Sequence, residues 1–292
     1  MKFKHWFAFI LLAAIWSSSF LWIKIAIREL SPITLVALRT FFGALVGIIA
    51  ILVTRTRLPH SRSVWIALMI LGLTNVAIPF GLITWGELSI DSAVASILNA
   101  TVPLFTFLIA TIFLNDEGFK PGNIVGLLIG FGGVIILLMK DLQPGSHNLF
   151  LGQAAVLLAA IFYAGSMVYA RITTDRVSGL VRGIMPLMSA TVIMGTGSFA
   201  LESPVKLPSL PITWLAVVWL GVLGSGLAFI LWYYLLQEIG PTRAALVTYI
   251  LPLGGVILGV VFLNEALSWN LAFGGLMIVT SVIVMNRKSS SH

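Results

Sequence analysis

Residues 99–116 read NATVPLFTFLIATIFLND, and residues 248–265, which lie 149 positions further along, read TYILPLGGVILGVVFLNE. Both stretches carry a proline at the same place, Pro103 and Pro252, and both end on Phe-Leu-Asn followed by an acid. Chance explains isolated leucine matches between apolar segments. It does not explain a shared helix proline and a shared Phe-Leu-Asn-acid block in one register, so the sequence predicts a duplicated unit.

The register of this repeat extends on both sides of the motif. Leu71-Gly72 matches Leu220-Gly221 at the same offset and without a gap. Nearer the N-terminus, the segment from Trp16 to Ser19 lies over Tyr163 to Ser166 at a slightly different offset. We therefore divide the chain into a first five-helix unit at residues 1–143 and a second one at residues 144–292.

The composition places both units in a membrane. Hydrophobic residues make up 59% of the chain and charged residues 9%, and the mean hydropathy is +1.07. A water-soluble domain carries roughly 25% charged residues, so this chain has too few to cover a water-facing surface. The net charge of +7 does not indicate nucleic-acid binding, because the basic residues gather in short loops, where they set topology.

The apolar runs predict an all-α, polytopic membrane protein with ten transmembrane helices. A span needs about 20 mostly apolar residues. No small-residue cleavage pattern follows the first run, so we interpret it as a span and not as a signal peptide. The predicted spans cover residues 5–24, 33–53, 64–85, 92–114, 121–139, 151–171, 180–201, 212–236, 242–263 and 269–286.

The distribution of lysine and arginine predicts the orientation of these spans. If the N-terminus is cytoplasmic, most basic residues fall in cytoplasmic segments, and only Lys24, Arg28, Lys140 and Lys206 fall outside. This bias follows the positive-inside rule and predicts that both termini are cytoplasmic. Because each unit has five spans, the second unit enters from the opposite side. Such inverted repeats are typical of secondary transporters, whose binding site lies near the midplane between the repeats.

A series of motifs in a fixed order makes the chain resemble a known family. The motifs are Ile15-Trp16-Ser17-Ser18-Ser19-Phe20 with Lys24, then Ser31-Pro32, Leu38-Arg39, Asn99-Ala100-Thr101-Val102-Pro103 and Phe113-Leu114-Asn115-Asp116-Glu117. This series resembles that of EamA-type transporters of the drug/metabolite transporter superfamily. The second unit repeats it less fully through Pro252 and Phe262 to Glu265, and the resemblance covers nearly the whole chain.

The resemblance implies export of small metabolites, often amino acids, across the bacterial inner membrane by alternating access. We accordingly expect a multi-pass protein of that membrane that exports aromatic or neutral amino acids. A broad substrate specificity is compatible with this expectation. Related branches of the superfamily carry other cargo. Export of drugs, nucleobases or organic cations by the same fold is therefore the alternative.

Polar and aromatic side chains inside the spans are the candidates for substrate binding, since such groups are costly in hydrocarbon. Trp16 and Ser19 lie three residues apart and share one helix face. Tyr163 and Ser166 occupy the matching positions of the second unit. The functional interpretation places both pairs in a central cavity, where Trp16 stacks on substrate or closes a gate. The alternative is packing between helices.

Further candidates come from the third, fourth and ninth spans. Asn75 and Pro79 lie four residues apart on the third span, where the proline frees a backbone carbonyl that could face a cavity. Ser96 and Asn99 belong to a polar stripe on the fourth span. Thr248 and its neighbour Tyr249 belong to the corresponding stripe on the ninth. Hydroxyl groups can also bond to their own helix, so a structural role stays open for each.

The charged residues bear on how substrate could be held and on how transport could be coupled to an ion gradient. Lys24 and Arg39 could each attract a carboxylate or phosphate of the substrate, snorkel to the interface, or pair with Glu29. We favour a structural role for Arg39 and leave Lys24 open. The acids, including Glu87 and Glu265, fall at or near helix ends. We therefore expect facilitated exchange, or a coupling mechanism that avoids a buried carboxylate.

Other classes of protein fit this sequence less well. An intramembrane lipid-modifying enzyme needs clustered His, Asp, Glu or Cys, and the spans hold no such cluster, so we predict no catalytic residue, metal site or cofactor. A passive channel usually forms its pore from an oligomer. The expected partners are a small-molecule substrate and the lipid bilayer, with no nucleic acid. Glycine pairs such as Gly43/Gly47 favour packing within a monomer, and dimerisation is the alternative.

Overall fold

The computed structural model describes residues 3–114, 121–139 and 147–286, and its regular structure within these ranges is entirely helical. The first unit contributes α1 (Phe3–Ala26), α2 (Pro32–Thr54), α3 (Arg62–Leu71), η1 (Gly72–Ala77), α4 (Ile78–Gly86), α5 (Ser92–Asn99), α6 (Val102–Phe113) and α7 (Pro121–Met139). The second contributes α8 (His147–Thr173), α9 (Gly179–Leu201), α10 (Pro211–Val218), η2 (Trp219–Leu227), α11 (Ala228–Ile239), α12 (Pro241–Ala244), α13 (Val247–Leu263) and α14 (Trp269–Asn286).

These elements confirm the prediction of an all-helical membrane protein with ten apolar helices. Eight helical runs are long and apolar enough to cross a membrane, and Val247–Leu263 and Trp269–Met285 are shorter apolar helices. The largest differences from the predicted ends are at α13, which begins at Val247 and not at residue 242, and at α8, which begins at His147 and not at residue 151. The first copy of the Asn-acid block, from Asn115 to Glu117, lies outside the described residues, as does Lys140.

The outward faces of the bundle suit contact with lipid. Large apolar side chains stay exposed along α2, α7 and α14, for example those of Val53, Leu128 and Phe273. A patch of this extent on a water-soluble protein would cause association. In a bilayer the same side chains contact hydrocarbon, which agrees with the apolar composition.

Two of the spans are interrupted by a π-helical segment at matching places. The third span runs from α3 through η1 into α4, and the eighth runs from α10 through η2 into α11. Gly72 in η1 and Gly221 in η2 are the equivalent glycines of the sequence repeat. A Cβ atom on Gly221 would lie 2.9 Å from the Arg39 carbonyl oxygen, and one on Gly72 would lie 2.8 Å from the Pro186 carbonyl oxygen. Both glycines therefore allow a neighbouring helix backbone to approach closely.

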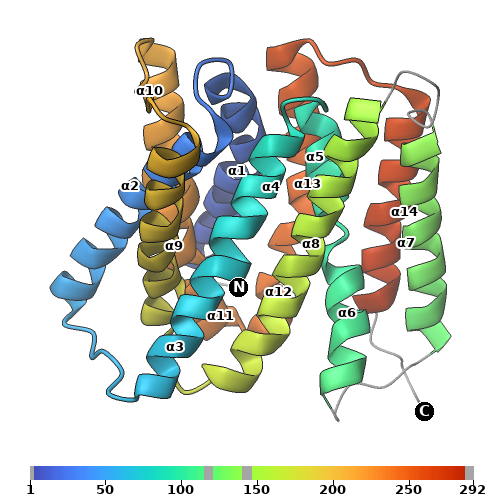
Figure 1. Ribbon diagram of the computed structural model, residues 1–292. Coiled ribbons are helices and arrows are strands. Elements are labelled where there is room, and N and C mark those ends of the chain that lie inside the picture. The colour runs from blue at the N-terminus through green and yellow to red at the C-terminus, as the bar shows by residue number, and fades with distance from the viewer. Residues whose placement is uncertain (1–2, 115–120, 140–146, 287–292) are drawn as a thin grey trace.

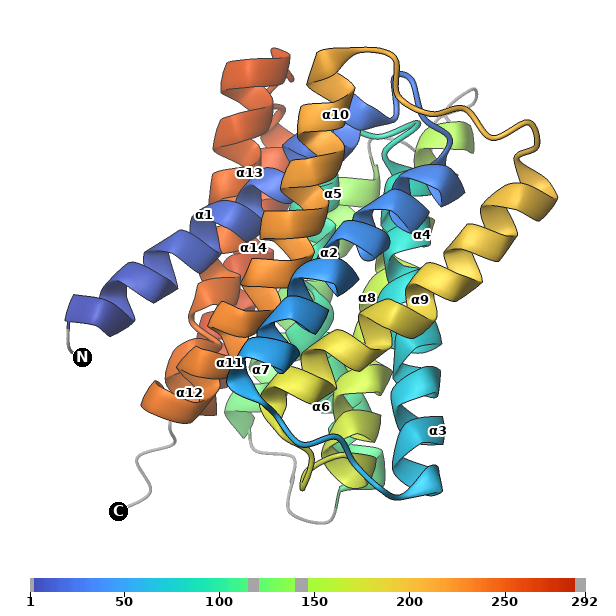
Figure 2. The same cartoon turned by 90° about the vertical axis from the view of Figure 1, so that its left-hand side faces the viewer.

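The helices pack as a bundle in which elements of the two units alternate. α2 packs against α9 on one side of the molecule, and α7 packs against α14 on the other (Figure 1). Between them, α1 packs mainly against α13, η2 and α11 of the second unit, while α8 packs against α4, α5 and α6 of the first. The view from the side shows α1 crossing in front of α13 and α14 (Figure 2). Each unit thus places its first helix among the helices of the other.

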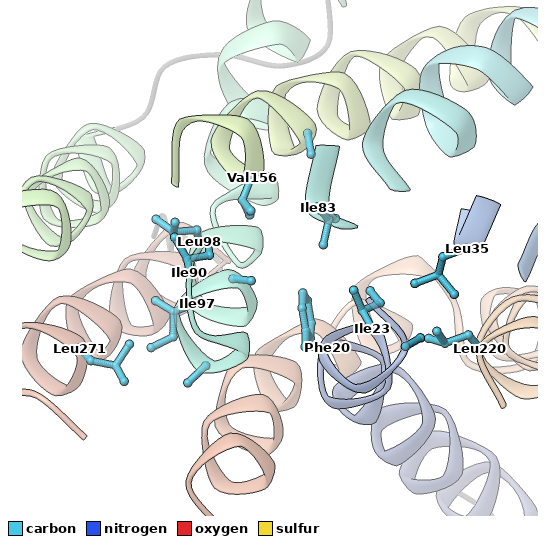
Figure 3. Packing of buried hydrophobic residues seen from close by; sticks show 14 of the residues in the cluster. Phe20, Ile23, Leu35, Ile83, Ile90, Ile97, Leu98, Val156, Leu220 and Leu271 are labelled. Atoms are coloured by element: carbon cyan, nitrogen blue, oxygen red, sulfur yellow. The ribbon is translucent and has the colours of Figure 1, made fainter. Parts of the chain in front are cut away.

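A buried apolar cluster closes one end of the bundle. It lies toward the end where α1 and α7 finish and where α5 and α14 begin. Side chains from nine helical elements converge there, and Figure 3 shows several of them, among them Phe20, Ile23, Leu35, Ile83, Ile97, Val156, Leu220 and Leu271. Helix association in lipid depends on such close van der Waals packing, so this cluster holds the two units together at that end.

Candidate functional site

Arg39 of α2 is the most buried basic side chain at the junction of the two units. Its exposed fraction is 6%. At 1.5 Å per residue, Arg39 lies roughly 10 Å along the helix axis from Pro32, the first residue of α2. Its Nε donates to Ser225 Oγ of η2 at 3.0 Å. The guanidinium carbon lies 3.9 Å from the centre of the Phe80 ring, which is a cation–π contact. A charged group this far inside a span is a candidate for function.

The π-helical turn of η2 positions the acceptor for Arg39. Ser225 Oγ donates its own hydrogen to the Leu220 carbonyl oxygen, five residues earlier, at 3.0 Å. The hydroxyl oxygen thereby presents a lone pair to the guanidinium group. π-helical turns often occur at functional sites, because they re-aim side chains within a helix.

Two of the predicted site residues lie beside this arginine. Ser19 Oγ and one terminal nitrogen of Arg39 face the same point on Gly224, at 3.3 and 3.9 Å from where a Cβ atom would stand. Tyr163 of α8 is half-buried, packs between two of the core clusters and lies within electrostatic range of Arg39. Ser19 also donates to the Ile15 carbonyl oxygen at 3.3 Å.

Trp16 and Ser166 contact other helices. The Trp16 ring is 5.5 Å from Trp232 and 6.5 Å from Phe229, so α1 and α11 share an aromatic cluster. Ser166 Oγ donates to Thr74 Oγ1 at 2.9 Å and thereby ties α8 to η1. The two hydroxyl–aromatic pairs of the repeat therefore face different surroundings.

The remaining candidates are distributed over several helix contacts. Ser96 Oγ donates to the Ala93 carbonyl oxygen at 2.8 Å and packs on Gly255, and Thr248 Oγ1 donates to the Ala245 carbonyl oxygen at 2.7 Å. Both hydroxyls thus bond to their own helix. Tyr249 turns toward α14, where its hydroxyl donates to the Val282 carbonyl oxygen at 3.3 Å.

Asn99, Asn75 and Pro79 lie at helix irregularities. Asn99 is the last residue of α5, and its buried Oδ1 has no hydrogen-bond partner among the described residues. Asn75 is half-buried within η1, and buried Pro79 begins the helix that follows. An unpaired buried amide oxygen is uncommon and suits a group that meets a substrate or water. Contact of all ten candidates with substrate stays a prediction.

Lys24 has a structural role in the described part of the chain. Its Nζ donates to the carbonyl oxygens of Glu87 and Ile90 at 2.6 and 2.8 Å. These carbonyl groups belong to the turn between α4 and α5, where helix geometry provides no partner. Lys24 therefore closes the end of α4, and this resolves the choice that the sequence left open.

Glu87, one of the acids that the sequence places near a helix end, lies in the turn between α4 and α5 and is buried. Its exposed fraction is 0%, and neither carboxyl oxygen has a hydrogen-bond partner among the described residues. Burial raises the pKa of Glu87 well above its usual value, because the charged form is poorly solvated there. A signal was present in the sequence: only five residues, 87–91, separate two apolar spans, and so short a turn cannot carry a side chain far into water.

Three other acids join the two units at one end of the bundle. Glu202 accepts the amides of Ile33 and Thr34 at the start of α2, at 3.0 and 2.8 Å. Glu265 accepts those of Ser92 and Ala93 at the start of α5, at 2.8 and 2.9 Å. Free amides at a helix start favour a negative charge, so each acid stabilises a helix of the other unit.

Glu29 makes the third of these links. It accepts hydrogen bonds from the amides of Ser209 and Leu210, immediately before α10. The hydrogen bond from the Ser209 hydroxyl, followed by that from Thr213, lowers the pKa of Glu29 to about 2. Glu29 is therefore ionised throughout the physiological range and binds α10 rather than Arg39 or Lys24.

Comparison with known proteins gives a family match over both units. A model described as the EamA-like transporter family matches residues 4–139 and, a second time, residues 150–287. The chain is 30% identical over 280 residues to the "Uncharacterized inner membrane transporter YedA" of Escherichia coli K12, covering 94% of this chain and 88% of that protein. It is 24% identical to the "Uncharacterized transporter YoaV" of Bacillus subtilis, covering 92% of each.

A more distant relative and a solved structure extend these matches. An "Uncharacterized transporter" of Archaeoglobus fulgidus is 27% identical over 291 residues, covering 98% of this chain and 99% of the relative. One crystal structure is similar with a TM-score of 0.70 and 23% identity over 98% of both chains. At that identity the structural match shows a shared fold alone.

Proposed function

The chain belongs to the EamA-like transporter family, and from this premise we propose that it exports small metabolites, chiefly neutral and aromatic amino acids, by alternating access. The relatives are named as transporters, which supports a transport role and not an enzymatic one. We assign the protein to the bacterial inner membrane. The apolar helices and the printed name of the relative YedA support that assignment.

One observation carries the proposed mechanism, namely that helix contacts recur with the two units exchanged. α1 packs against the eighth and ninth spans, and α8 packs against the third and fourth. α2 packs against η2, and α9 packs against η1. A molecule built from two such bodies has two arrangements of similar energy, which open to opposite sides of the membrane. Inverted repeats with both termini in the cytoplasm are part of this proposal.

The side chains near the junction support a neutral or zwitterionic cargo. Trp16 and Tyr163 offer aromatic surface, while Ser19 and Asn99 offer neutral polar groups. A site of this kind is mostly apolar, with a few polar groups that fix orientation. All of these residues come from one chain, so a monomer is sufficient for the proposed cycle.

The proposal is tested by transport into proteoliposomes that contain the purified protein. Vesicles are preloaded with one unlabelled amino acid, and counterflow of the labelled compound is measured with and without a pH gradient. Nucleosides and organic cations are screened in parallel. We expect counterflow of at least one neutral amino acid without a gradient. Transport of organic cations alone, and only with a pH gradient, would contradict the proposal.

The assigned pathway is tested separately with matched substitutions. We expect Trp16→Ala and Asn99→Ala to reduce amino-acid counterflow by about tenfold, the size of a lost contact worth about 1.4 kcal/mol. Trp269→Ala is the control for the first, since Trp269 is 88% exposed on α14. Asn148→Ala, at an exposed position of α8, is the control for the second. Normal transport by both folded test variants would show that the assigned lining is wrong.

A further inference from the structure

Arg39 is a buried cation with few partners. Among the described residues its guanidinium group makes one hydrogen bond, the one from Nε to Ser225 Oγ. Its terminal nitrogens are left without a protein acceptor, while Phe80 covers one face of the group. A charge at this depth is costly unless it is paired and hydrogen-bonded. The terminal nitrogens of Arg39 can therefore donate hydrogen bonds to an anionic partner.

No acid of the described chain supplies that anion. Glu87 is the carboxyl group in electrostatic range of Arg39, but neither of its carboxyl oxygens has a hydrogen-bond partner among the described residues, so it forms no ion pair with Arg39. Glu29, Glu202 and Glu265 are each engaged with the amides at a helix start. Within the part of the chain that the structure describes, Arg39 therefore has no acidic partner, and an anion from outside the protein could fill that place.

The neighbours of Arg39 suit a carboxylate. Ser19 Oγ and a terminal nitrogen of Arg39 lie 3.3 and 3.9 Å from the same point on Gly224, so a hydroxyl group lies near the guanidinium fork, and it would have to turn from the Ile15 carbonyl oxygen to donate to a substrate. The planar fork presents parallel N–H groups that match the two oxygens of a carboxylate. Gly224 carries no side chain, and a Cβ atom there would come within 3.3 Å of Ser19 Oγ.

We propose that Arg39 is a substrate-binding residue that receives the carboxylate of the transported molecule, with Ser19 beside it and Ser225 fixing the guanidinium plane. This inference rests on the proposed transport function and narrows it, because it requires a cargo with a carboxylate. Amino acids and other small carboxylates qualify. Organic cations and nucleobases, which lack that group, do not.

The test uses probes that differ in one group and share a side chain. L-phenylalanine, phenylethylamine and phenylpropionate form an aromatic series, and L-leucine, isoamylamine and isocaproate form an aliphatic one. Inorganic phosphate is added as a different anion. The readouts are the rise in Tm of the purified full-length protein with each probe and the inhibition of amino-acid counterflow in proteoliposomes. We expect only the carboxylate-bearing probes to act on the wild type.

Substitutions then assign the effect to Arg39. We expect Arg39→Gln to raise the half-maximal concentration of the carboxylate probes at least tenfold, and Arg39→Lys to raise it several-fold, because lysine keeps the charge but loses the fork. Arg182→Gln is the matched control. Arg182 also lies over an aromatic ring, that of Tyr233 at 5.9 Å, but it donates to the carbonyl oxygens of Asp175 and Val177.

The outcomes separate this inference from the proposed function. If amino acids are transported but the amines compete as well as the carboxylates, or Arg39→Lys and Arg39→Gln bind normally, the carboxylate site is wrong and the transport function stands. The probe series on the wild type decides the matter even if both Arg39 variants misfold. Stabilisation by phosphate alone, or by no carboxylate, also overturns the inference. Transport of organic cations only overturns both proposals.

Discussion

The interface of α2 with η2 and the interface of α9 with η1 are built alike. In the first, Gly221 allows the Arg39 carbonyl to approach, and in the second, Gly72 does the same for the carbonyl of Pro186. In both cases a side chain on the glycine would meet main-chain atoms of the neighbouring helix. The duplicated sequence has thus kept the same close helix contact on both sides of the molecule.

The side chains at these two interfaces differ. The first has a buried arginine and a serine acceptor, Arg39 and Ser225. The second has Pro186 where the first has Arg39, and Val76 where the first has Ser225. The close helix packing occurs at both interfaces, whereas of these two pairs of positions only the first holds a charged side chain, that of Arg39. Equivalent close helix contacts thus occur with and without a buried charge beside them.

The largest expected effect concerns the feature that the interfaces share. Gly221→Val and Gly72→Val each force two helices apart, and we expect each to destabilise the protein by about 3 kcal/mol. Thermal unfolding in detergent measures the loss. The clash at Gly72 falls partly on the Ser189 side chain, so Ser189→Gly should recover part of the loss there. Full stability of either valine variant would show that the close contact is not needed.

The next effect concerns the chemistry that the interfaces do not share. Ser225→Ala removes the acceptor of Arg39, and an unpaired buried donor costs about 1 to 3 kcal/mol. We expect a lower Tm and several-fold weaker binding of L-phenylalanine or L-leucine. Val76→Ser, at the matching position of η1, should leave carboxylate binding unchanged. Equal losses of binding in both variants would remove the distinction between the interfaces.

A smaller effect is expected at the N-termini of α2 and α9, whose first amides have different acceptors. α2 begins with its amides on Glu202 of the other unit, whereas α9 begins with Val181 donating to its own Ser178 at 3.5 Å. We expect Glu202→Ala to cost about 2 kcal/mol and Ser178→Ala about 0.5 kcal/mol, the upper and lower ends for helix caps. Unfolding in detergent gives both values, and a larger cost for Ser178→Ala would contradict the assignment.

The smallest effect is a pH dependence of the same cap. Partial burial alone would raise the pKa of Glu202, but hydrogen bonds from Ser31, Ile33 and Thr34 outweigh it and lower that pKa. A lowered pKa gives stabilisation that is complete above the ordinary value of 4.5 and is lost as the pH falls below it. The Tm difference between wild type and Glu202→Gln should therefore shrink on acidification. The difference for Ser178→Ala should stay constant, and growth of the Glu202 difference at low pH would contradict the prediction.

The fold followed from the sequence with small errors because bilayer hydrocarbon imposes a simple rule on length and polarity. Helix ends such as that of α8 were displaced by a few residues, since polar residues near the interface extend a helix without penalty. The site was harder. Ser19 and Tyr163 were proposed and lie beside Arg39, for which we propose substrate contact in place of the structural role that the sequence favoured. The burial of Glu87 was not foreseen.

These differences have a common physical origin. Hydropathy records which residues enter the membrane, and the repeat records which positions are equivalent. Neither records the surroundings of a side chain, which depend on helices far apart in the chain. The sequence alone determined the membrane class, the ten helices, the family and the duplicated motif. The tertiary structure decided that Lys24 closes a helix, that Glu87 is buried, and that Arg39 lies among hydroxyl and aromatic groups with no acid paired to it among the described residues. The reason is that only packing brings α1, α2, α4 and η2 together.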